Sequence, residues 1–229
     1  MAQGSVPVLT IDGPSGSGKG TLAQRLARQL GWHLLDSGAL YRVVGLAAVE
    51  QGVGLDDETG LAAIAEHLPI CFAASAPGEP AAVILDGRDI SKDVRSEQAG
   101  YYASRVAVFE AVRNALQARQ RAFAQPPGLV ADGRDMGTEV FPDAPLKVYL
   151  TASAEERAQR RYKQLKNKGE NVSLATLLED IRARDKRDSE RVVAPLRPAP
   201  DAHIIDSTVL PIDEVEQQVL GLLRARRMI

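Results

Sequence analysis

The sequence predicts an α/β fold in which a mainly parallel, five-stranded sheet is covered by helices on both faces. Short apolar runs alternate with longer segments of helical periodicity, and a glycine-rich loop joins the first run to the first helix. Strands that alternate with helices form parallel sheets buried on both faces. With 229 residues, the chain is long enough for one such domain with a small insertion.

Five apolar runs are predicted to be the buried strands of this sheet, and six segments between or after them to be helices. The strands are Val6–Ile11, Trp32–Leu35, Leu129–Ala131, Leu146–Leu150 and Ala202–Ile205. The helices are Lys19–Leu30, Ser37–Gln51, Glu110–Phe123, Ser153–Lys168, Ser173–Arg187 and Pro211–Arg226. Start signals support several helices: Ser37 is a candidate cap, Ser153 opens a capping-box pattern, and Pro211 suits a first turn.

The stretch Leu61–Ala107 departs from this alternation and predicts a small antiparallel β insert, at approximately residues 65–105. Asp86-Gly87 is a hairpin signature and Pro77-Gly78 a turn signal. The short strands expected there are Leu68–Ala74, Ala81–Leu85 and Ile90–Ser91.

Composition narrows the function classes. The formal net charge is −2, so no general basic field favours nucleic acid as a partner. No apolar stretch approaches the ~20 residues that cross a bilayer, and the first residues lack the pattern of a signal peptide. The single cysteine, Cys71, fits a reducing compartment and lies in an apolar run, which predicts a buried thiol. We therefore expect a cytoplasmic protein without a membrane or nucleic-acid partner.

The segment from Gly13 to Thr21 predicts a phosphate-binding loop, because it follows a strand and opens a helix. Gly13, Gly16 and Gly18 allow backbone angles that point successive N–H groups at an anion. The helix N-terminus adds favourable dipoles and Lys19 a mobile cation. This loop places the fold among the P-loop NTPases, three-layer sandwiches of helices and sheet. Its candidate ATP-binding residues are Gly13, Pro14, Ser15, Gly16, Ser17, Gly18, Lys19, Gly20 and Thr21.

The loop departs from the usual P-loop pattern at one position. A Ser or Thr normally follows the lysine, but here Gly20 intervenes and the hydroxyl comes from Thr21. We therefore expect Mg²⁺ to be held mainly by phosphates and water. Thr21 and Asp132 are the candidate contributors from the chain, mainly through water, since Asp132 occupies a position where a carboxylate can orient magnesium water.

Two further motifs follow strands, at the sheet edge where open α/β folds bind ligands. The first is Asp36-Ser-Gly-Ala-Leu-Tyr-Arg42, in which Arg42 suits a phosphate. The second is Asp132-Gly-Arg-Asp135, which ends a buried strand and projects charge toward an acceptor. The same four letters recur at Asp86–Asp89. Because they follow a hairpin pattern there, we expect only a turn.

Two arginine clusters predict a mobile lid at approximately residues 155–172. One cluster lies on the helix after the fourth strand, and the other runs from Arg182 to Arg191. A lone surface arginine contributes only ~0.2–1 kcal/mol through an ion pair. Two clusters around a polar segment in a phosphate-binding protein instead suggest a lid that brings fixed positive charge to the phosphates and expels water. The first cluster contains Arg157, Arg160 and Arg161.

Four motifs together resemble the bacterial cytidylate kinase family over essentially the whole chain: GPSGSGKGT, DSGALYR, LVADGRDMGT and RARDKRDSERVVAP. The resemblance implies one kinase domain over residues 1–229, in which the insert forms an acceptor-binding subdomain. It also implies transfer of the γ-phosphate of ATP to CMP or dCMP, with Mg²⁺, in pyrimidine nucleotide metabolism.

Residue roles follow from the same resemblance. Ser104, Arg113 and Asp135 resemble the cytosine readers, which would reject uracil by leaving buried polar groups unpaired. Arg184 and Asp188 resemble the pair that contacts the sugar hydroxyls, and Tyr41 shapes the pocket. Arg157 and Arg160 resemble lid contacts to ATP. The implied acceptor-phosphate contacts are Ser37, Arg42, Arg134 and Arg191, and the implied catalytic residues are Lys19, Arg134, Arg160 and Arg191.

Several alternatives remain open at the level of sequence. A related kinase for UMP, AMP or a small metabolite would share the loop and the lid. A guanine-nucleotide switch would share the P-loop, but the nearest approach to its base-reading motif is Asn167-Lys-Gly-Glu170, which no strand precedes. A non-catalytic nucleotide-binding module would not need the arginine-rich lid. We expect a monomer, because lid closure does not require a second chain.

Overall fold

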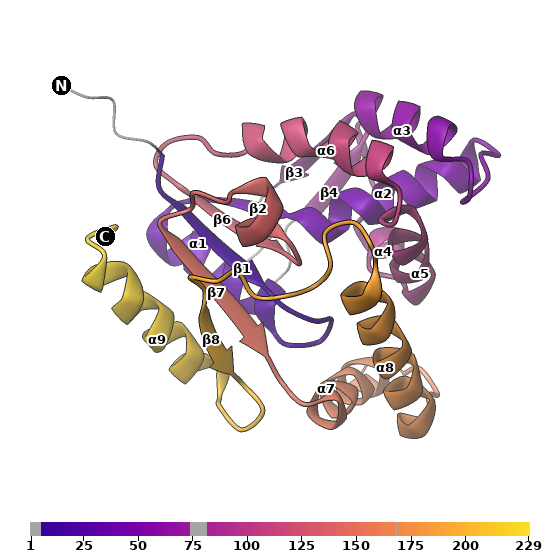
Figure 1. Cartoon of the computed structure of the whole chain (residues 1–229). Helices are drawn as coiled ribbons and strands as arrows, with labels where there is room; N and C mark the ends of the chain where they lie inside the picture. Colours follow the sequence, from indigo (N-terminus) through magenta and orange to yellow (C-terminus); the bar gives the residue numbers. More distant parts are fainter. Residues whose placement is uncertain (1–5, 74–81, 168) are drawn as a thin grey trace. The chain divides into compact units, whose positions relative to one another are not determined.

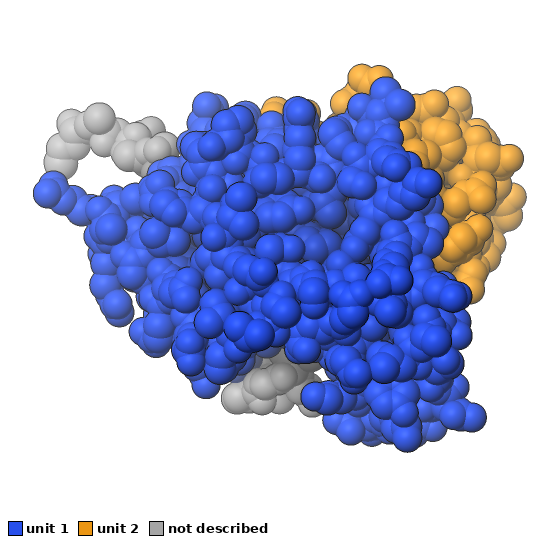
Figure 2. Space-filling model, turned by 60° about the horizontal axis from the view of Figure 1, so that its bottom comes forward, with its two compact units in different colours: residues 1–34, 124–229 blue, residues 35–123 orange. Residues whose placement is uncertain are grey.

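The computed structural model describes residues 6–73, 82–167 and 169–229 (Figure 1). The chain divides into two compact units, coloured separately in Figure 2. Unit 1 comprises Met1–Leu34 and Ala124–Ile229, and unit 2 comprises Leu35–Phe123. Each unit is described below by itself.

The main sheet confirms the predicted α/β architecture. Its five strands have the order β2-β6-β1-β7-β8, and β1 pairs in parallel with both β6 and β7. Strand β8 extends the sheet in parallel beside β7. The bounds are β1 Val8–Asp12, β2 His33–Asp36, β6 Leu129–Gly133, β7 Leu146–Thr151 and β8 His203–Asp206. All five coincide with the predicted apolar runs to within about two residues.

The core of unit 1 lies on one face of this sheet. Leu9 and Ile11 point from β1 into a cluster with helices α1 (Lys19–Leu30) and α9 (Ile212–Ala225). Because side chains alternate along a strand, Thr10 and Asp12 point to the opposite face. There they meet the turn that follows β6, so this face is built for polar contacts rather than for packing alone.

Helix α7 (Ala154–Asn167) makes up most of the segment predicted to be a lid, and α8 (Leu174–Glu190) follows that segment. Both helices lie close to their predicted bounds. The Ser153 hydroxyl accepts a hydrogen bond from the Glu156 N–H at 3.2 Å, which confirms its role as the cap of α7. Between β6 and β7 the chain forms a five-residue π-helical turn, η1 (Met136–Val140), which the sequence analysis did not anticipate.

Unit 2 contains the predicted antiparallel sheet, of three strands in the order β3-β4-β5. The Asp86-Gly87 hairpin is confirmed: these residues have φ 49° and 74°, and β4 pairs with β5 across them. The strand predicted at Ile90–Ser91 is wrong, because the third strand is Arg88–Asp89 and Ser91 starts a helix. The Pro77-Gly78 turn lies outside the described residues. The other strands are β3 Ile70–Ala73 and β4 Ala82–Leu85.

Helices form the rest of unit 2, including several that were not predicted within Leu61–Ala107. Helix α3 starts after Asp57, whose carboxylate accepts from the Gly60 N–H at 3.0 Å. Helix α5 starts after Ser96, which accepts from the Ala99 N–H at 3.1 Å. These caps were readable in the sequence and were overlooked. The bounds are α2 Ser37–Glu50, α3 Glu58–His67, α4 Ser91–Val94, α5 Glu97–Val106 and α6 Glu110–Ala122.

Two further expectations for unit 2 need correction. Asp36, not Ser37, caps α2: its carboxylate accepts from the Ala39 N–H at 3.0 Å. Cys71 is exposed rather than buried, because β3 is a short strand of a small sheet and not part of the core. Across the described parts of both units, no helix has the length and apolar character needed to cross a membrane.

Candidate active site

The phosphate loop has the backbone that its glycines predict. Gly16 and Gly18 have φ of 80° and 95°, in the region that favours glycine, and Gly18 directly precedes α1. Gly13 is required for a different reason, since a Cβ there would lie 2.0 Å from the carbonyl oxygen of Leu150. The loop thus ends at the N-terminus of a twelve-residue helix, where unpaired N–H groups favour an anion.

Cationic side chains hold the carbonyl groups of this loop. The Lys19 Nζ donates to the Pro14 carbonyl at 3.2 Å. Arg157 Nη1 donates to the Ser15 carbonyl at 3.1 Å, and Arg160 Nη1 to the Ser17 carbonyl at 3.2 Å. In a planar trans peptide the C=O and the following N–H point in opposite directions. Fixing the carbonyls on one side therefore turns the next N–H groups to the other side.

A pocket of about 520 Å³ opens beside the loop, entirely within unit 1. Its polar part contains Lys19, Arg160 and Ser207, and its apolar part comes from the loop after β8 and the start of α9. The sequence analysis missed this apolar wall, because its residues follow helical spacing and read as ordinary core. The wall consists of Leu210, Pro211, Ile212 and Val215, together with Leu150.

Arg160 lines this pocket and is held by several contacts. Its Nε forms an ion pair with Glu156 at 2.9 Å, and its guanidinium also donates to the carbonyl of Ser207. The Ser207 hydroxyl donates to the Ser17 carbonyl at 3.1 Å, so the segment directly after β8 also supports the loop. Arg161, from the same helix, lines the pocket and donates to Gln164.

Asp132 lies near the end of β6, beside Gly20 at the start of α1. A Cβ added at Gly20 would lie 3.2 Å from Asp132 Oδ2, so the missing side chain gives this carboxylate its room. Asp132 is only 7% exposed. Carboxylate and hydroxyl oxygens suit Mg²⁺, but the described residues contain no cluster of three or more His, Cys, Asp or Glu that could hold a metal alone. Asp132 and Thr21 therefore fit an ion whose other ligands are phosphate and water.

Asp12 is a buried carboxylate that the sequence analysis passed over. Its two oxygens accept from the N–H groups of Met136 and Gly137, both at 2.8 Å. Burial raises the pKa of Asp12 to about 7, against the lowering effect of these N–H groups and of Lys19. Asp12 thereby joins the end of β1 to the turn η1, directly after the predicted contacts Arg134 and Asp135.

Arg134 and Asp188 form a largely buried ion pair through the Arg134 Nε, with side chains 16% and 7% exposed. Burial opposes charge on Asp188, but the charges of Arg134, Arg184 and Arg191 hold the pKa of this carboxyl below its usual range. Of these three predicted arginines, Arg134 makes the direct contact with Asp188. Burial opposes charge on Arg134, but Asp188, followed by Asp132 and Asp135, raises the pKa of this guanidinium. Asp135 is itself only 3% exposed.

Unit 2 brings other predicted residues together. The Arg113 guanidinium lies over the Tyr41 ring, 5.7 Å from its centroid, and both side chains are buried. The buried Ser37 hydroxyl accepts from Gln120 Nε2 at 3.4 Å. Gln120, 1% exposed on α6, is a candidate that sequence reasoning missed, because glutamine on a helix normally reads as a surface residue.

Arg42 and Ser104, also in unit 2, contact backbone carbonyls. Arg42 Nη1 donates to the carbonyls of Val94 and Ser96, at 2.7 Å and 3.3 Å. It therefore connects α2 to the junction of α4 and α5. The Ser104 hydroxyl donates to the Gly100 carbonyl one turn earlier in α5, at 3.3 Å. The roles that the resemblance implies for both side chains stay predictions.

The fold and this site define a P-loop nucleotide-binding protein of the α/β class. Residues 9–225 match the sequence profile of the cytidylate kinase family. The chain is 60% identical to a cytidylate kinase of Pseudomonas fluorescens (strain Pf-5) over 220 residues, 96% of each chain. It is also 60% identical to a cytidylate kinase of Stutzerimonas stutzeri (strain A1501) over 216 residues, 94% of each. The chain therefore belongs to the cytidylate kinase family.

Among solved structures, a gluconokinase from Sinorhizobium meliloti 1021 is similar with a TM-score of 0.47 and 15% identity, over 96% of this chain and 94% of that one. A shikimate kinase from Acinetobacter baumannii has a TM-score of 0.43 and 21% identity, over 98% and 96%. These likenesses are too distant to bear on the substrate.

Proposed function

We propose that this protein transfers the γ-phosphate of ATP to CMP or dCMP, giving ADP and CDP or dCDP, in pyrimidine nucleotide metabolism. The observation that supports this most is the phosphate loop, whose residues from Gly16 to Thr21 line one pocket together with Arg160. An acceptor phosphate is already an anion, so the reaction needs alignment and screening of repulsion rather than a strong base. Membership of the cytidylate kinase family supports the choice of acceptor.

We place ATP with its phosphates on the residues Gly13–Thr21 and its base against the apolar wall that includes Leu210 and Ile212. An apolar pocket with a few convergent polar groups suits a purine. Lys19 would contact the β and γ phosphates, and Arg160 would stabilise charge on the transferring group. Both are proposed as catalytic residues, together with Arg134 and Arg191 at the acceptor phosphate.

Mg²⁺ is the proposed cofactor, bound with ATP. Asp132 and Thr21 would hold it mainly through water, beside the gap left by Gly20. When bound, the ion neutralises charge on the phosphates. The chain's own contribution is to orient ATP on the loop and to hold its guanidinium groups near the phosphates.

We propose that CMP or dCMP contacts the residues for which the family resemblance implies an acceptor role. In unit 2, Ser104 and Arg113 would read the cytosine, Tyr41 would shape the pocket, and Ser37 and Arg42 would bind phosphate. In unit 1, Asp135 would complete the reading of the base, and Arg184 and Asp188 would contact the sugar. The ion pair between Arg134 and Asp188 supports this, because it holds one predicted phosphate contact next to the predicted sugar contacts.

We propose the domain organisation that the sequence predicts. Residues 1–229 would act as one kinase domain, approximately 65–105 as an acceptor-binding subdomain, and approximately 155–172 as a lid. Closure of that lid would expel water from the phosphates. We further propose a cytoplasmic monomer that uses neither nucleic acid nor a membrane.

A coupled ADP-release assay tests the function. CMP, dCMP, UMP and AMP are each supplied with ATP and Mg²⁺, and kcat/KM is compared. We expect CMP and dCMP to be used far better than UMP, because a site built for the cytosine edge leaves polar groups unpaired with uracil. Turnover of AMP far above that of CMP would contradict the proposal and favour a related kinase.

A further inference from the structure

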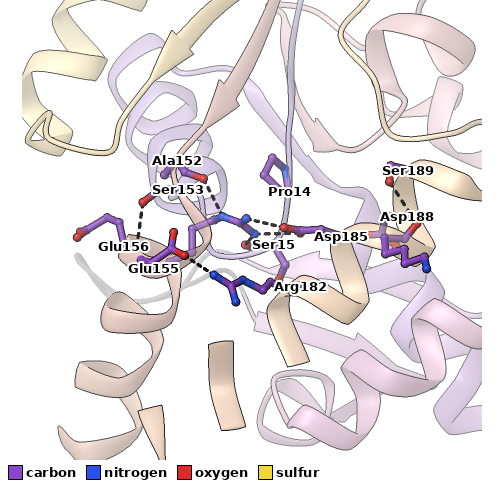
Figure 3. Close-up of polar contacts among 12 residues, drawn as sticks. Pro14, Ser15, Ala152, Ser153, Glu155, Glu156, Arg182, Asp185, Asp188 and Ser189 are labelled. Atoms are coloured by element: carbon purple, nitrogen blue, oxygen red, sulfur yellow. Dashed lines mark hydrogen bonds and ion pairs between the residues drawn. The ribbon is translucent and has the colours of Figure 1, made fainter. Parts of the chain in front are cut away.

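One buried arginine of unit 1 joins segments that are far apart in the sequence. Figure 3 labels its contact partners Ser15, Ala152 and Asp185. Arg157 lies in the first turn of α7, and its side chain is 5% exposed. Its Nε donates to the Ala152 carbonyl at the end of β7, at 2.9 Å. Its other nitrogens reach Ser15 in the phosphate loop and Asp185 on α8.

The contact with the phosphate loop acts on the loop's backbone. Arg157 Nη1 donates to the Ser15 carbonyl at 3.1 Å, so the N–H of Gly16, across the same planar peptide, points away from Arg157. A Cβ at Gly16 would lie only 3.2 Å from the Arg157 Cβ, which shows how closely the two segments pack. Arg157 is therefore placed to orient an N–H donor of the loop through this backbone contact.

The contact with α8 is a two-pronged ion pair. Arg157 Nη1 and Nη2 donate to Asp185 Oδ1 and Oδ2 at 2.9 Å and 2.5 Å. Paired bonds of this kind fix both distance and angle. One turn further along α8, Asp188 is paired with Arg134. The carboxylates thus tie the same helix to the phosphate loop and to the proposed acceptor contacts.

We propose that Arg157 and Asp185 are positioning residues that set the backbone of the phosphate loop and link it to α8. The link makes nucleotide binding at the loop and CMP binding at α8 affect each other's affinity, and this second part rests on the proposed function. Any such effect must be reciprocal, because it is a coupling free energy between two sites. The family resemblance implied a direct contact between Arg157 and ATP. Here Arg157 acts on nucleotide binding indirectly, through the Ser15 carbonyl.

The test is Asp185→Asn in the full chain, which keeps the shape of the side chain but removes its charge. We expect ADP with Mg²⁺ to bind about tenfold more weakly by calorimetry, equivalent to about 1.4 kcal/mol. We also compare the dissociation constant of CMP without ADP and with saturating ADP. In the unaltered protein the two values should differ, and in the variant their ratio should move to one.

The chain offers a matched control in the ion pair between Glu155 and Arg182, which joins the same helices α7 and α8 at 2.6 Å (Figure 3). Both of its side chains are 60% exposed, and neither is hydrogen-bonded to the loop in the described contacts. Glu155→Gln should therefore change ADP affinity by less than about twofold, as for an exposed pair.

Arg157→Lys is the second variant, in case Asp185→Asn does not fold. A lysine keeps the charge but cannot reproduce the two-pronged contact, so we expect the same losses. Thermal unfolding establishes that each variant is folded before binding is measured.

Unchanged ADP affinity in a folded Asp185→Asn or Arg157→Lys chain would overturn the proposal, as would an equal loss in Glu155→Gln. The link to α8 would be overturned if the ratio of CMP dissociation constants, without and with ADP, is one in the unaltered protein. It would also be overturned if a ratio different from one persists in both variants. If the unaltered protein neither binds nor phosphorylates CMP, the proposed function fails. The ADP comparison still decides the role of the pair at the loop.

Discussion

At the scale of single residues, the phosphate loop depends on glycines whose missing side chains leave room for neighbouring groups. Gly20 lacks the side chain that would crowd Asp132, and Gly13 lacks one that would overlap Leu150. Sequence reasoning identified these glycines from the motif alone. It also placed Asp132 at the magnesium site, but it could not identify Leu150 as the neighbour of Gly13, because β7 reaches the loop only once the sheet has formed.

Lys19→Ala should lower kcat by several orders of magnitude, because it removes the cation nearest the transferring phosphate; single cations at such sites contribute on the order of 10³-fold or more. The coupled ADP-release assay measures this. Lys92→Ala, at an exposed position of α4, serves as the control and should leave kcat unchanged. A Lys19→Ala enzyme with near-normal turnover would favour a non-catalytic role for the loop.

Gly20→Ala should weaken the response to Mg²⁺. The new Cβ would stand 3.2 Å from Asp132 Oδ2, so the carboxylate must shift by a few tenths of an ångström. Loss of a residue that orients metal ligands typically costs about 10–100-fold in metal affinity, and we expect the low end of that range. The measurement is the Mg²⁺ concentration that gives half-maximal rate.

Gly221→Ala is the matched control for this variant. Nothing lies within 4 Å of a Cβ at Gly221, which is in the interior of α9. The change should stabilise the fold by about 0.5–1 kcal/mol and leave the Mg²⁺ response as it was. If Gly20→Ala also leaves the Mg²⁺ response unchanged, Asp132 has no part in magnesium binding.

At the scale of elements, local signals predicted most helix starts, and errors arose where two signals competed. The glycine loop, the Ser153 cap and the apolar runs each favour one structure, and α1, α7 and the parallel strands follow them. In unit 2, apolar runs suggested strands through a stretch where the caps Asp57 and Ser96 start helices. The η1 turn has no local signal, since Asp12, far away in sequence, holds its first N–H groups.

Asp36 and Ser37 are neighbours with separable roles. Asp36→Ala should destabilise the protein by about 1 kcal/mol, because the first turn of α2 loses its cap. Ser37→Ala should have a smaller effect on stability but should raise the KM for CMP, if the proposed phosphate contact holds. Denaturant unfolding and steady-state kinetics on both variants separate the effects. If Ser37→Ala destabilises the protein more than Asp36→Ala does, Ser37 and not Asp36 caps α2.

At the scale of the whole molecule, the buried carboxylate Asp12 makes global stability depend on pH. Its pKa is raised from 3.8 to about 7 on folding, so the folded protein binds more protons than the unfolded chain between these values. The free energy of unfolding should therefore fall as pH rises through this range, by about 4 kcal/mol from this group alone. Asp188 has a lowered pKa and acts with the opposite sign, at more acidic pH.

Asp12→Asn isolates this contribution. The variant cannot ionise, so the difference in unfolding free energy between variant and unaltered protein should shift in favour of the variant as pH rises from 4 to 8. Loss of one hydrogen bond to η1 changes the unfolding free energy of the variant by the same amount at every pH. Denaturant titrations at several pH values supply the numbers. A difference that stays flat across this range would mean that Asp12 is ionised throughout.

The carbonyl contacts at Ser15 and Ser17 have a consequence for how a ligand is received. Guanidinium groups hold the loop's peptides before any nucleotide arrives, so much of the entropy lost in ordering the loop is lost during folding. An anion that offers only phosphate oxygens should then find a ready-made receptor. Inorganic tripolyphosphate, without base or ribose, should compete with ATP for it.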